Sequence, residues 1–238
     1  METIAQNIQR LQETKEAIKQ ALINKAVSVS NTDTFYSYAN KINNIQTIPS
    51  SGVFIYATDG TLNDIDKWTS LGKSARGVAI VTPKHRFLLA PTKPKIDKTG
   101  WYFAIGDTIE GLPITVDADI NDFNGKEYTA ILVNNPTYSK WPVYQCYTYS
   151  YADIQEGNWY LPSIGEWNCI MRSFGAVQDA LQIIEGDSLY RNEEYWTSNI
   201  YDTRIAWTCY TNSNGSNRWD KRSMSYEYCV RACAPLNI

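Results

Sequence analysis

The first 22 residues carry apolar side chains at alternating intervals of four and three, a spacing that fits an amphipathic α-helix. Lys15 is the one polar residue at these positions, and the apolar ones are Ile4, Ile8, Leu11, Ile18 and Leu22. A stripe this narrow is usually covered by another helix, either in the same chain or in a second copy. A polar residue in such a stripe can set register and oligomer number. We therefore predict a coiled-coil-like oligomerisation helix, with a homotrimer as the expected form.

A second short helix is predicted after residues 30–34, which are rich in N-cap residues. Apolar side chains follow there at helical spacing, at Phe35, Tyr38, Ala39, Ile42 and Ile45. Pro49 and Gly52 break this helix, and all eight Trp residues lie beyond them. We predict a helical oligomerisation and attachment module at 1–48 and a second domain at 49–238. The alternative is that these helices simply pack on the domain that follows.

From Val53 onward, short alternating segments separated by turns replace the helical period. Helices are predicted at 165–174 and 176–185, where glycines bound the apolar segments. Strands are predicted at 53–56, 77–81, 86–90, 101–105, 128–133, 143–149, 195–198, 205–210 and 228–232. The predicted fold class is therefore α+β.

Composition excludes several classes of function. With 22 basic and 25 acidic side chains the net charge is -3, which argues against nucleic acid as a partner. His85 is the single histidine, so it would have to supply any His-based chemistry, and its place beside Lys84 and Arg86 favours a turn residue over a catalytic base. No apolar stretch approaches the roughly 20 residues of a membrane helix, so no membrane insertion is expected. The acidic start, with Glu2, is unlike a secretory signal peptide.

The five cysteines are odd in number and lack CxxC spacing, which fits neither a disulfide framework nor a zinc site. We expect them to be reduced thiols. No metal and no cofactor is predicted.

Five groups of residues, in order along the chain, resemble landmarks of the C-type-lectin-like family that includes the variable proteins of diversity-generating retroelements. These groups are Trp159-Tyr160-Leu161-Pro162-Ser163, Gly165-Glu166-Trp167, Tyr195-Trp196-Thr197-Ser198, Ala206-Trp207 and Val230-Arg231-Ala232. The segments at 4–9 and 38–45 are similar to N-terminal modules of phage tail and baseplate proteins. The resemblance implies a C-type-lectin-like mixed α/β domain that displays a ligand-binding surface on its C-terminal loops.

In such variable proteins, the binding residues are diversified at template adenines, commonly in Asn codons. Substituting the two adenines of AAC never yields Glu, Gln, Lys, Trp or Met. Residues 199–226 contain no Glu or Gln, and the residues outside the reachable set are Trp207, Trp219, Lys221 and Met224. The resemblance thus implies a diversified segment at 199–226.

The same segment mixes aromatic rings, amides, hydroxyls and guanidinium groups, which binding loops favour. An alternative for 212–217 is that Asn, Ser and Gly serve only as turn residues. The predicted ligand-binding residues are Asn199, Tyr201, Asp202, Arg204, Tyr210, Asn212, Ser213, Asn214, Ser216, Asn217, Arg218, Trp219, Asp220 and Arg222. Trp207 is expected to be scaffold, and Trp219 fits either role.

The predicted function is that of a phage tail-fibre-tip, receptor-binding protein that recognises a host cell-surface protein or glycan and contacts other phage tail or baseplate proteins. The expected location is the virion tail tip. The alternative is a bacterial diversified binding protein with no virion role, located in the cytoplasm.

Two kinds of chemistry are set aside. The Glu-Pro-Asn and Trp-Asn-Asp triplets of calcium-dependent lectins are absent. Arg218-Trp219-Asp220 is similar to the second triplet only in part. Formylglycine-generating enzymes share the lectin-like architecture and use a C-terminal Cys pair, which invites comparison with Cys229 and Cys233. On one continuous strand this pair would lie about 13 Å apart, too far for a disulfide or a shared metal unless the strand breaks. The prediction is therefore no enzymatic activity, with a formylglycine-generating-type Cys oxidase as the least favoured alternative.

Overall fold

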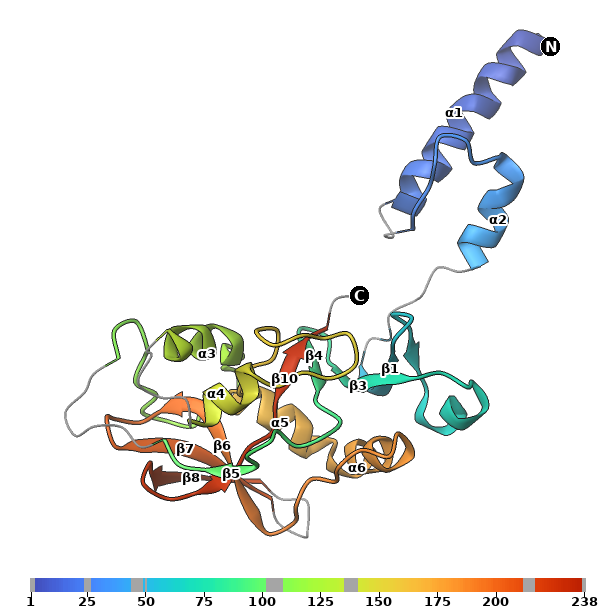
Figure 1. Ribbon diagram of the computed structural model, residues 1–238. Coiled ribbons are helices and arrows are strands. Elements are labelled where there is room, and N and C mark those ends of the chain that lie inside the picture. Colours follow the sequence, from blue (N-terminus) through green and yellow to red (C-terminus); the bar gives the residue numbers. More distant parts are fainter. Residues whose placement is uncertain are drawn as a thin grey trace. The chain divides into compact units, whose positions relative to one another are not determined.

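The computed structural model describes residues 3–23, 27–43, 49, 51–101, 109–134, 141–211 and 217–236. The chain forms two compact units, Met1–Ile48 and Pro49–Ile238. Figure 1 shows the helices and strands of both units.

The first unit contains α1, Ile4–Ile23, and α2, Phe35–Asn43. Leu22 and Tyr38 are its buried apolar residues among those described. The Lys41 ammonium donates to the Ser28 carbonyl at 2.6 Å and pairs with Asp33 at 3.2 Å, which fixes the connection between the helices. The Lys15 ammonium lies 6.0 Å from the centre of the Tyr38 ring. The second half of the apolar stripe therefore meets α2.

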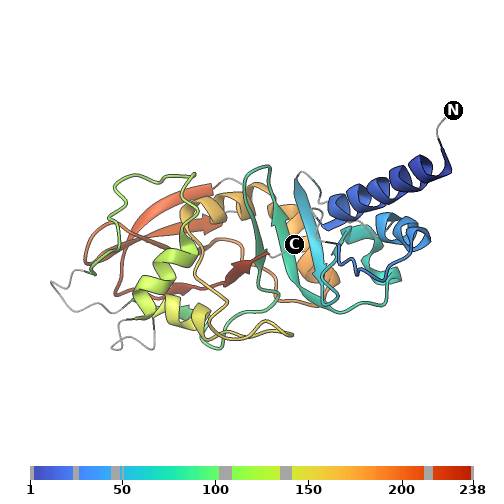
Figure 2. The same ribbon diagram turned by 90° about the horizontal axis from the view of Figure 1, so that it is seen from above.

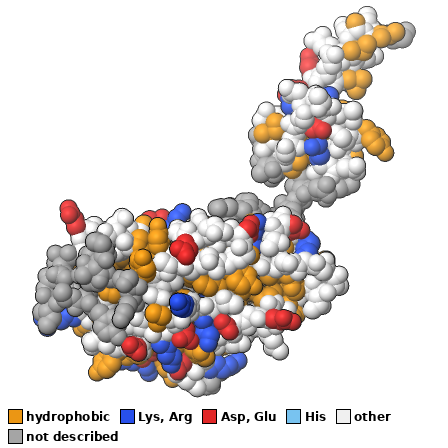
Figure 3. Space-filling model, in the orientation of Figure 1, with side chains coloured by type: hydrophobic (Ala, Val, Ile, Leu, Met, Phe, Trp, Pro, Cys, Tyr) orange, Lys and Arg blue, Asp and Glu red, His pale blue; other side chains and the backbone are white. Residues whose placement is uncertain are grey.

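The first half of the stripe is not covered by the described residues of this unit. Ile4, Ile8 and Leu11 are 80%, 52% and 63% exposed. Figure 3 shows hydrophobic side chains at the free end of α1 and on α2. Two short helices bury too little apolar surface to be stable alone, so these side chains favour a further contact.

The second unit contains two five-stranded sheets. Sheet A has the order β10-β4-β3-β1-β2 and sheet B has the order β5-β9-β6-β7-β8. Sheet A is formed by β1 Gly52–Ala57, β2 Leu62–Asn63, β3 Ala75–Val81, β4 Arg86–Leu89 and β10 Cys233–Pro235. Sheet B is formed by β5 Lys98–Thr99, β6 Glu193–Ile200, β7 Ile205–Thr211, β8 Asn217–Ser223 and β9 Tyr228–Cys229. All strand pairs are antiparallel except the single β6–β9 contact at Tyr195 and Cys229.

Among the described residues of this unit, four α-helices and one short 3-10 helix accompany these sheets. They are η1 Ile65–Ser70, α3 Gly125–Val133, α4 Pro142–Tyr147, α5 Ile164–Arg172 and α6 Phe174–Ile183. The described part of the chain is thus a mixed α+β protein with an N-terminal helix and antiparallel sheets.

The alternation of side chains in sheet A places a hydrophobic cluster on each of its faces. Ile55, Val78 and Ile80 point into the cluster that includes α5 and α6. Ala79 and Leu88 point into the other cluster, which contains α3 and α4 and the buried tryptophans Trp101, Trp141, Trp159 and Trp196. Viewed from above, β1, β3 and β4 lie side by side (Figure 2).

Two predicted strands are helices. Residues 128–133 belong to α3, and residues 143–149 overlap α4, which begins at Pro142. Short apolar runs look alike in a buried strand and a buried helix, so period alone does not separate them. Pro142 at the first helical turn was the available signal, because its ring fixes φ near the helical value and its missing N–H is not needed there.

The bounds of the other predicted elements lie closer to those in the structure. Helices α5 and α6 begin one or two residues before their predicted starts. Of the predicted strand at 101–105, residues 102–105 lie outside the described residues. The predicted strand at 228–232 breaks after Cys229, and the chain passes from β9 in sheet B to β10 in sheet A.

Candidate binding surface

The β7–β8 hairpin contains most of the described candidate residues, and β8 is an edge strand of sheet B. Its register pairs Tyr210 with Arg218, Thr208 with Asp220, and Ala206 with Arg222. Because alternate side chains of a strand point to opposite faces, these pairs share one face, while Trp207 and Lys221 lie on the other. The candidate residues are therefore divided between two faces, and segment 217–223 is a strand rather than the predicted loop.

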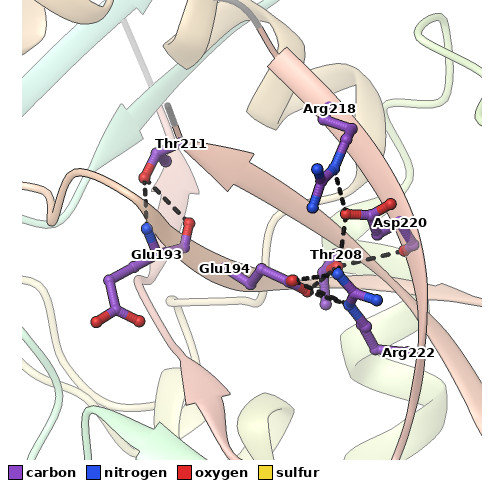
Figure 4. A network of polar contacts seen from close by, with 7 residues as sticks. All are labelled: Glu193, Glu194, Thr208, Thr211, Arg218, Asp220 and Arg222. Carbon is purple, nitrogen blue, oxygen red and sulfur yellow. Dashed lines mark hydrogen bonds and ion pairs between the residues drawn. The ribbon is translucent and has the colours of Figure 1, made fainter. Parts of the chain in front are cut away.

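One face carries a row of charged side chains, shown in Figure 4. The Arg222 guanidinium donates to both Glu194 oxygens, at 2.6 Å from Nη2 and 2.7 Å from Nε, and to Asp220 at 3.1 Å. Arg218 Nε donates to the same Asp220 oxygen at 2.6 Å. The Arg218 guanidinium also lies 4.7 Å from the centre of the Tyr210 ring. Hydrogen bonding to Glu194 raises the pKa of Arg222.

Neighbouring strands hold this charged row in place. Glu194, on β6, is buried, and its Oε2 accepts a hydrogen bond from the Thr208 hydroxyl at 2.7 Å. The Thr211 hydroxyl bonds to the Glu193 backbone, which secures the adjacent end of β6 (Figure 4). Arg218 is exposed, whereas Asp220 and Arg222 are half-buried. The row thus presents pre-oriented charged groups to solvent.

The opposite face carries an aromatic cluster around Lys221. Its ammonium lies 3.8 Å from the centre of the Tyr201 ring and 4.9 Å from that of Trp207, and the two rings meet edge to face at 6.4 Å. Trp207 Nε1 donates to the Thr115 carbonyl at 2.7 Å. The residues on either side of Thr115, Ile114 and Val116, are 60% and 61% exposed. Exposed apolar side chains beside such a cluster are typical of interaction sites.

Sequence reasoning missed two parts of this cluster. Lys221 is not among the residues that substitution of the AAC adenines can yield, and it was not a candidate. Segment 114–116 lies far from the hairpin in sequence. The segment is held by a hydrogen bond from Thr115 N to Ile200 O at 2.8 Å. The position of segment 114–116 beside the cluster depends on this long-range pairing with β6, which no local sequence pattern indicates.

Several predicted residues serve the scaffold. Asn199 is buried, its amide nitrogen donates to Asp122 at 2.6 Å, and its oxygen accepts the Ile164 N–H at 2.9 Å. We therefore leave Asn199 out of the candidate surface. Trp219 is half-buried and packs beside Cys209 in the core cluster of α5 and α6.

The remaining predicted residues lie in or next to turns. Asp202 accepts the backbone N–H groups of Arg204 and Ile205 at 2.7 and 2.9 Å, so it shapes the β6–β7 turn, while Arg204 is exposed. Asn217 opens β8. The predicted residues Asn212, Ser213, Asn214 and Ser216 lie outside the described residues.

The five cysteines are free, and four of them are buried. Burial raises the pKa of the Cys229 thiol to about 12, with Lys98 opposing the shift, and it also raises the pKa of Cys233. The strand does break between these two residues, so the spacing argument for a single strand does not apply to them. Both thiols are protonated near neutral pH, which makes them weak nucleophiles and metal ligands.

The described residues contain no cluster of three or more His, Cys, Asp or Glu side chains placed to hold a metal ion. None of the described helices is long and apolar enough to cross a bilayer.

Comparison with models of protein families finds no match, and neither does comparison with curated protein sequences. A fimbrial protein from Bacteroides ovatus ATCC 8483, whose crystal structure was determined at 1.85 Å, is similar in fold. The TM-score is 0.50 at 13% sequence identity, and the match covers 79% of this chain. It covers 49% of the fimbrial protein, so this chain spans about half of that protein's length.

Proposed function

We propose that the chain is a receptor-binding protein of a phage tail tip and that it binds a host-surface protein or glycan through the β7–β8 hairpin. One observation carries the proposal: this edge hairpin presents a buttressed charged row on one face, and on the other face it presents Lys221, which packs on Tyr201 and on the buried Trp207. Tyr, Trp and Arg dominate binding hot spots, and side chains already held in place lose little entropy on binding.

The finer part of the proposal is that the second unit is a C-type-lectin-like domain whose hairpin is diversified by a retroelement. The sequence landmarks support it, and so does the place of segment 199–226, which forms the end of β6, all of β7 and all of β8. A near-copy of the encoding DNA, differing almost only at adenines and lying near a reverse transcriptase gene, would support diversification. Differences spread evenly over all four bases would contradict it.

The first unit would oligomerise and attach the protein to the tail. Support comes from the exposed first half of the α1 stripe, which a second copy would cover. Three linked binding surfaces would raise a weak single-site affinity through multivalency. Light scattering on the whole chain should therefore give an oligomer, with a trimer as our expectation. A monomer in that experiment would refute this part.

Host binding provides the main test. We would compare the double variant Tyr201→Ala/Arg218→Ala with the control Lys95→Ala/Arg172→Ala, whose residues are exposed and lie on other elements. Arg218→Ala removes an anchor from the charged face of the hairpin, and Tyr201→Ala removes the ring of the β6–β7 turn that packs on Lys221 at the other face. Cell binding should therefore fall by about tenfold or more. Circular dichroism would establish that both variants fold. Unchanged binding by the first variant would rule out the hairpin as the site.

The second candidate is a bacterial binding protein with no virion role. The observation in its favour is the similarity in fold to a bacterial fimbrial protein. Antibody labelling of purified virions separates the two, because label at the tail tip supports the first candidate and its absence supports the second.

A further inference from the structure

A hollow of about 320 Å3 lies between the start of β4, the beginning of α3 and the beginning of α5. Its volume is at the lower end of the range for small-molecule sites. No residue of the β7–β8 hairpin lines it. Its lining includes Lys84, His85, Arg86, Phe123, Lys126 and Glu166.

The rim of this hollow is basic. Lys84, Arg86 and Lys126 are exposed, and within the described part of the chain none of them forms an ion pair. Glu127 is the exposed carboxylate among the lining residues. The chain as a whole carries a net charge of -3, so the positive charge of this rim differs in sign from the net charge of the protein. Such a concentration of one sign in a hollow attracts an anion.

The wall of the hollow supplies flat rings. His85 stacks on Phe123 with ring centres 3.6 Å apart and planes 4° from parallel. Burial, and then the charge of Lys84, lower the pKa of His85, so its ring is neutral at pH 7. Neutral stacked rings offer an apolar surface to one face of a sugar.

Glu166 adds little opposing charge. Its carboxyl group accepts a hydrogen bond from the Tyr160 hydroxyl at 2.7 Å and another from Ser163 N at 2.7 Å. Burial nevertheless raises its pKa to about 7, so the group is mostly neutral in slightly acidic solution. The three surface cations therefore exceed the charge of Glu127 and of a partly ionised Glu166.

A second hollow of about 390 Å3 adjoins the first, because Lys126 and Pro235 line both. Arg76 is fixed there by Asp153, with Nε to Oδ1 at 2.6 Å and Nη2 to Oδ2 at 2.5 Å. Asn158 adds an exposed amide. We call these two adjoining hollows the groove; the first is its basic end and the second its polar extension.

We propose that this groove binds an acidic oligosaccharide. A sugar carboxylate would meet Lys84, Arg86 and Lys126, its ring would lie against the His85 and Phe123 pair, and the following sugars would extend past Lys126 into the second hollow. A simple inorganic anion would not use the rings, and a neutral sugar would not use the cations. The groove is distinct from the hairpin surface, so either site can fail without the other.

Isothermal titration calorimetry with a galacturonic acid trimer tests the proposal, with maltotriose and inorganic phosphate as comparison ligands. Lys126→Met should weaken trimer binding by about tenfold or more, and Arg86→Met/Lys126→Met should weaken it further, because each change removes a charge-assisted contact. The matched control Lys95→Met/Arg172→Met should bind like the wild type, and so should Tyr201→Ala/Arg218→Ala. His85→Ala should weaken trimer binding without altering any weak phosphate binding.

Four results would overturn the proposal. They are no trimer binding at millimolar concentration, equal trimer binding by the Arg86→Met/Lys126→Met variant, maltotriose binding as tight as trimer binding, and phosphate binding as tight as trimer binding. Thermal melting of each variant by circular dichroism establishes that a loss of binding is not a loss of fold.

Discussion

Replacing Glu166 by glutamine should change how the stability of the second unit depends on pH. Glu166 is fully buried at the start of α5, and burial raises the pKa of its carboxyl group from 4.5 to about 7. Glutamine preserves the shape, and its oxygen can still accept the Ser163 N–H, as in a capping box. Its amide nitrogen can then donate to the Tyr160 hydroxyl, so the variant is expected to fold.

The folded protein binds the Glu166 proton more tightly than the unfolded chain does. The contribution of this proton to the free energy of unfolding is therefore fully present below pH 4.5 and is lost as the pH rises through about 7. Each unit of pKa shift corresponds to 1.36 kcal/mol, so the wild type should lose about 2 to 3 kcal/mol between pH 5 and pH 8 from this group. The glutamine variant lacks this loss.

Urea unfolding under reducing conditions at pH 5 and pH 8 measures the effect. The difference in unfolding free energy between the wild type and Glu166→Gln should shift by about 2 to 3 kcal/mol in favour of the variant at the higher pH. The control is Glu156→Gln, because Glu156 is exposed and its replacement should leave the pH dependence unchanged. The same difference at both pH values for Glu166→Gln would refute the reasoning.

Three further predictions concern packing, charge and thiols. Gly125→Ala should lower the unfolding free energy by about 1 to 3 kcal/mol in urea titrations, since its Cβ would lie 2.8 Å from Ser163 N; an unchanged midpoint would contradict this close approach. Arg222→Ala should cost about 1 to 3 kcal/mol in the same assay by leaving the buried Glu194 unpaired, and Arg222→Lys should restore part of it. With a colorimetric disulfide reagent in native buffer, only Cys169 should react readily, because the other four thiols are buried; rapid reaction of two or more would contradict this.

The part of the fold that local patterns determine was predictable. Strands β1, β3 and β4 follow alternating apolar segments next to turns, and α5 and α6 follow helical periods. The strands proposed at 128–133 and 143–149 are wrong because a short apolar run enters either kind of element, and here the surrounding core selects a helix. The mixed α+β class was correctly predicted, whereas the lectin-like topology stays a prediction.

The site was less predictable, for a physical reason. Segment 199–226 can be found by composition, but its division into two faces depends on the register of β7 and β8. The partner of Arg222 is Glu194, which lies 28 residues earlier on another strand. The buried, structural role of Asn199 likewise depends on its hydrogen bond to Asp122, 77 residues away. Tertiary pairing of this kind leaves no local pattern in the sequence.

The passage of the chain from β9 to β10 has a consequence for biosynthesis. Strand β10 completes the edge of sheet A by pairing with β4, through Cys233 and Leu89 and their neighbours. Sheet A therefore remains incomplete on the ribosome until residues 233–235 have emerged, although β4 is made more than 140 residues earlier. During that interval the edge of β4 is an unpaired, apolar template for other nascent chains. The yield of folded protein should thus depend on chaperone supply and on uninterrupted synthesis of β10.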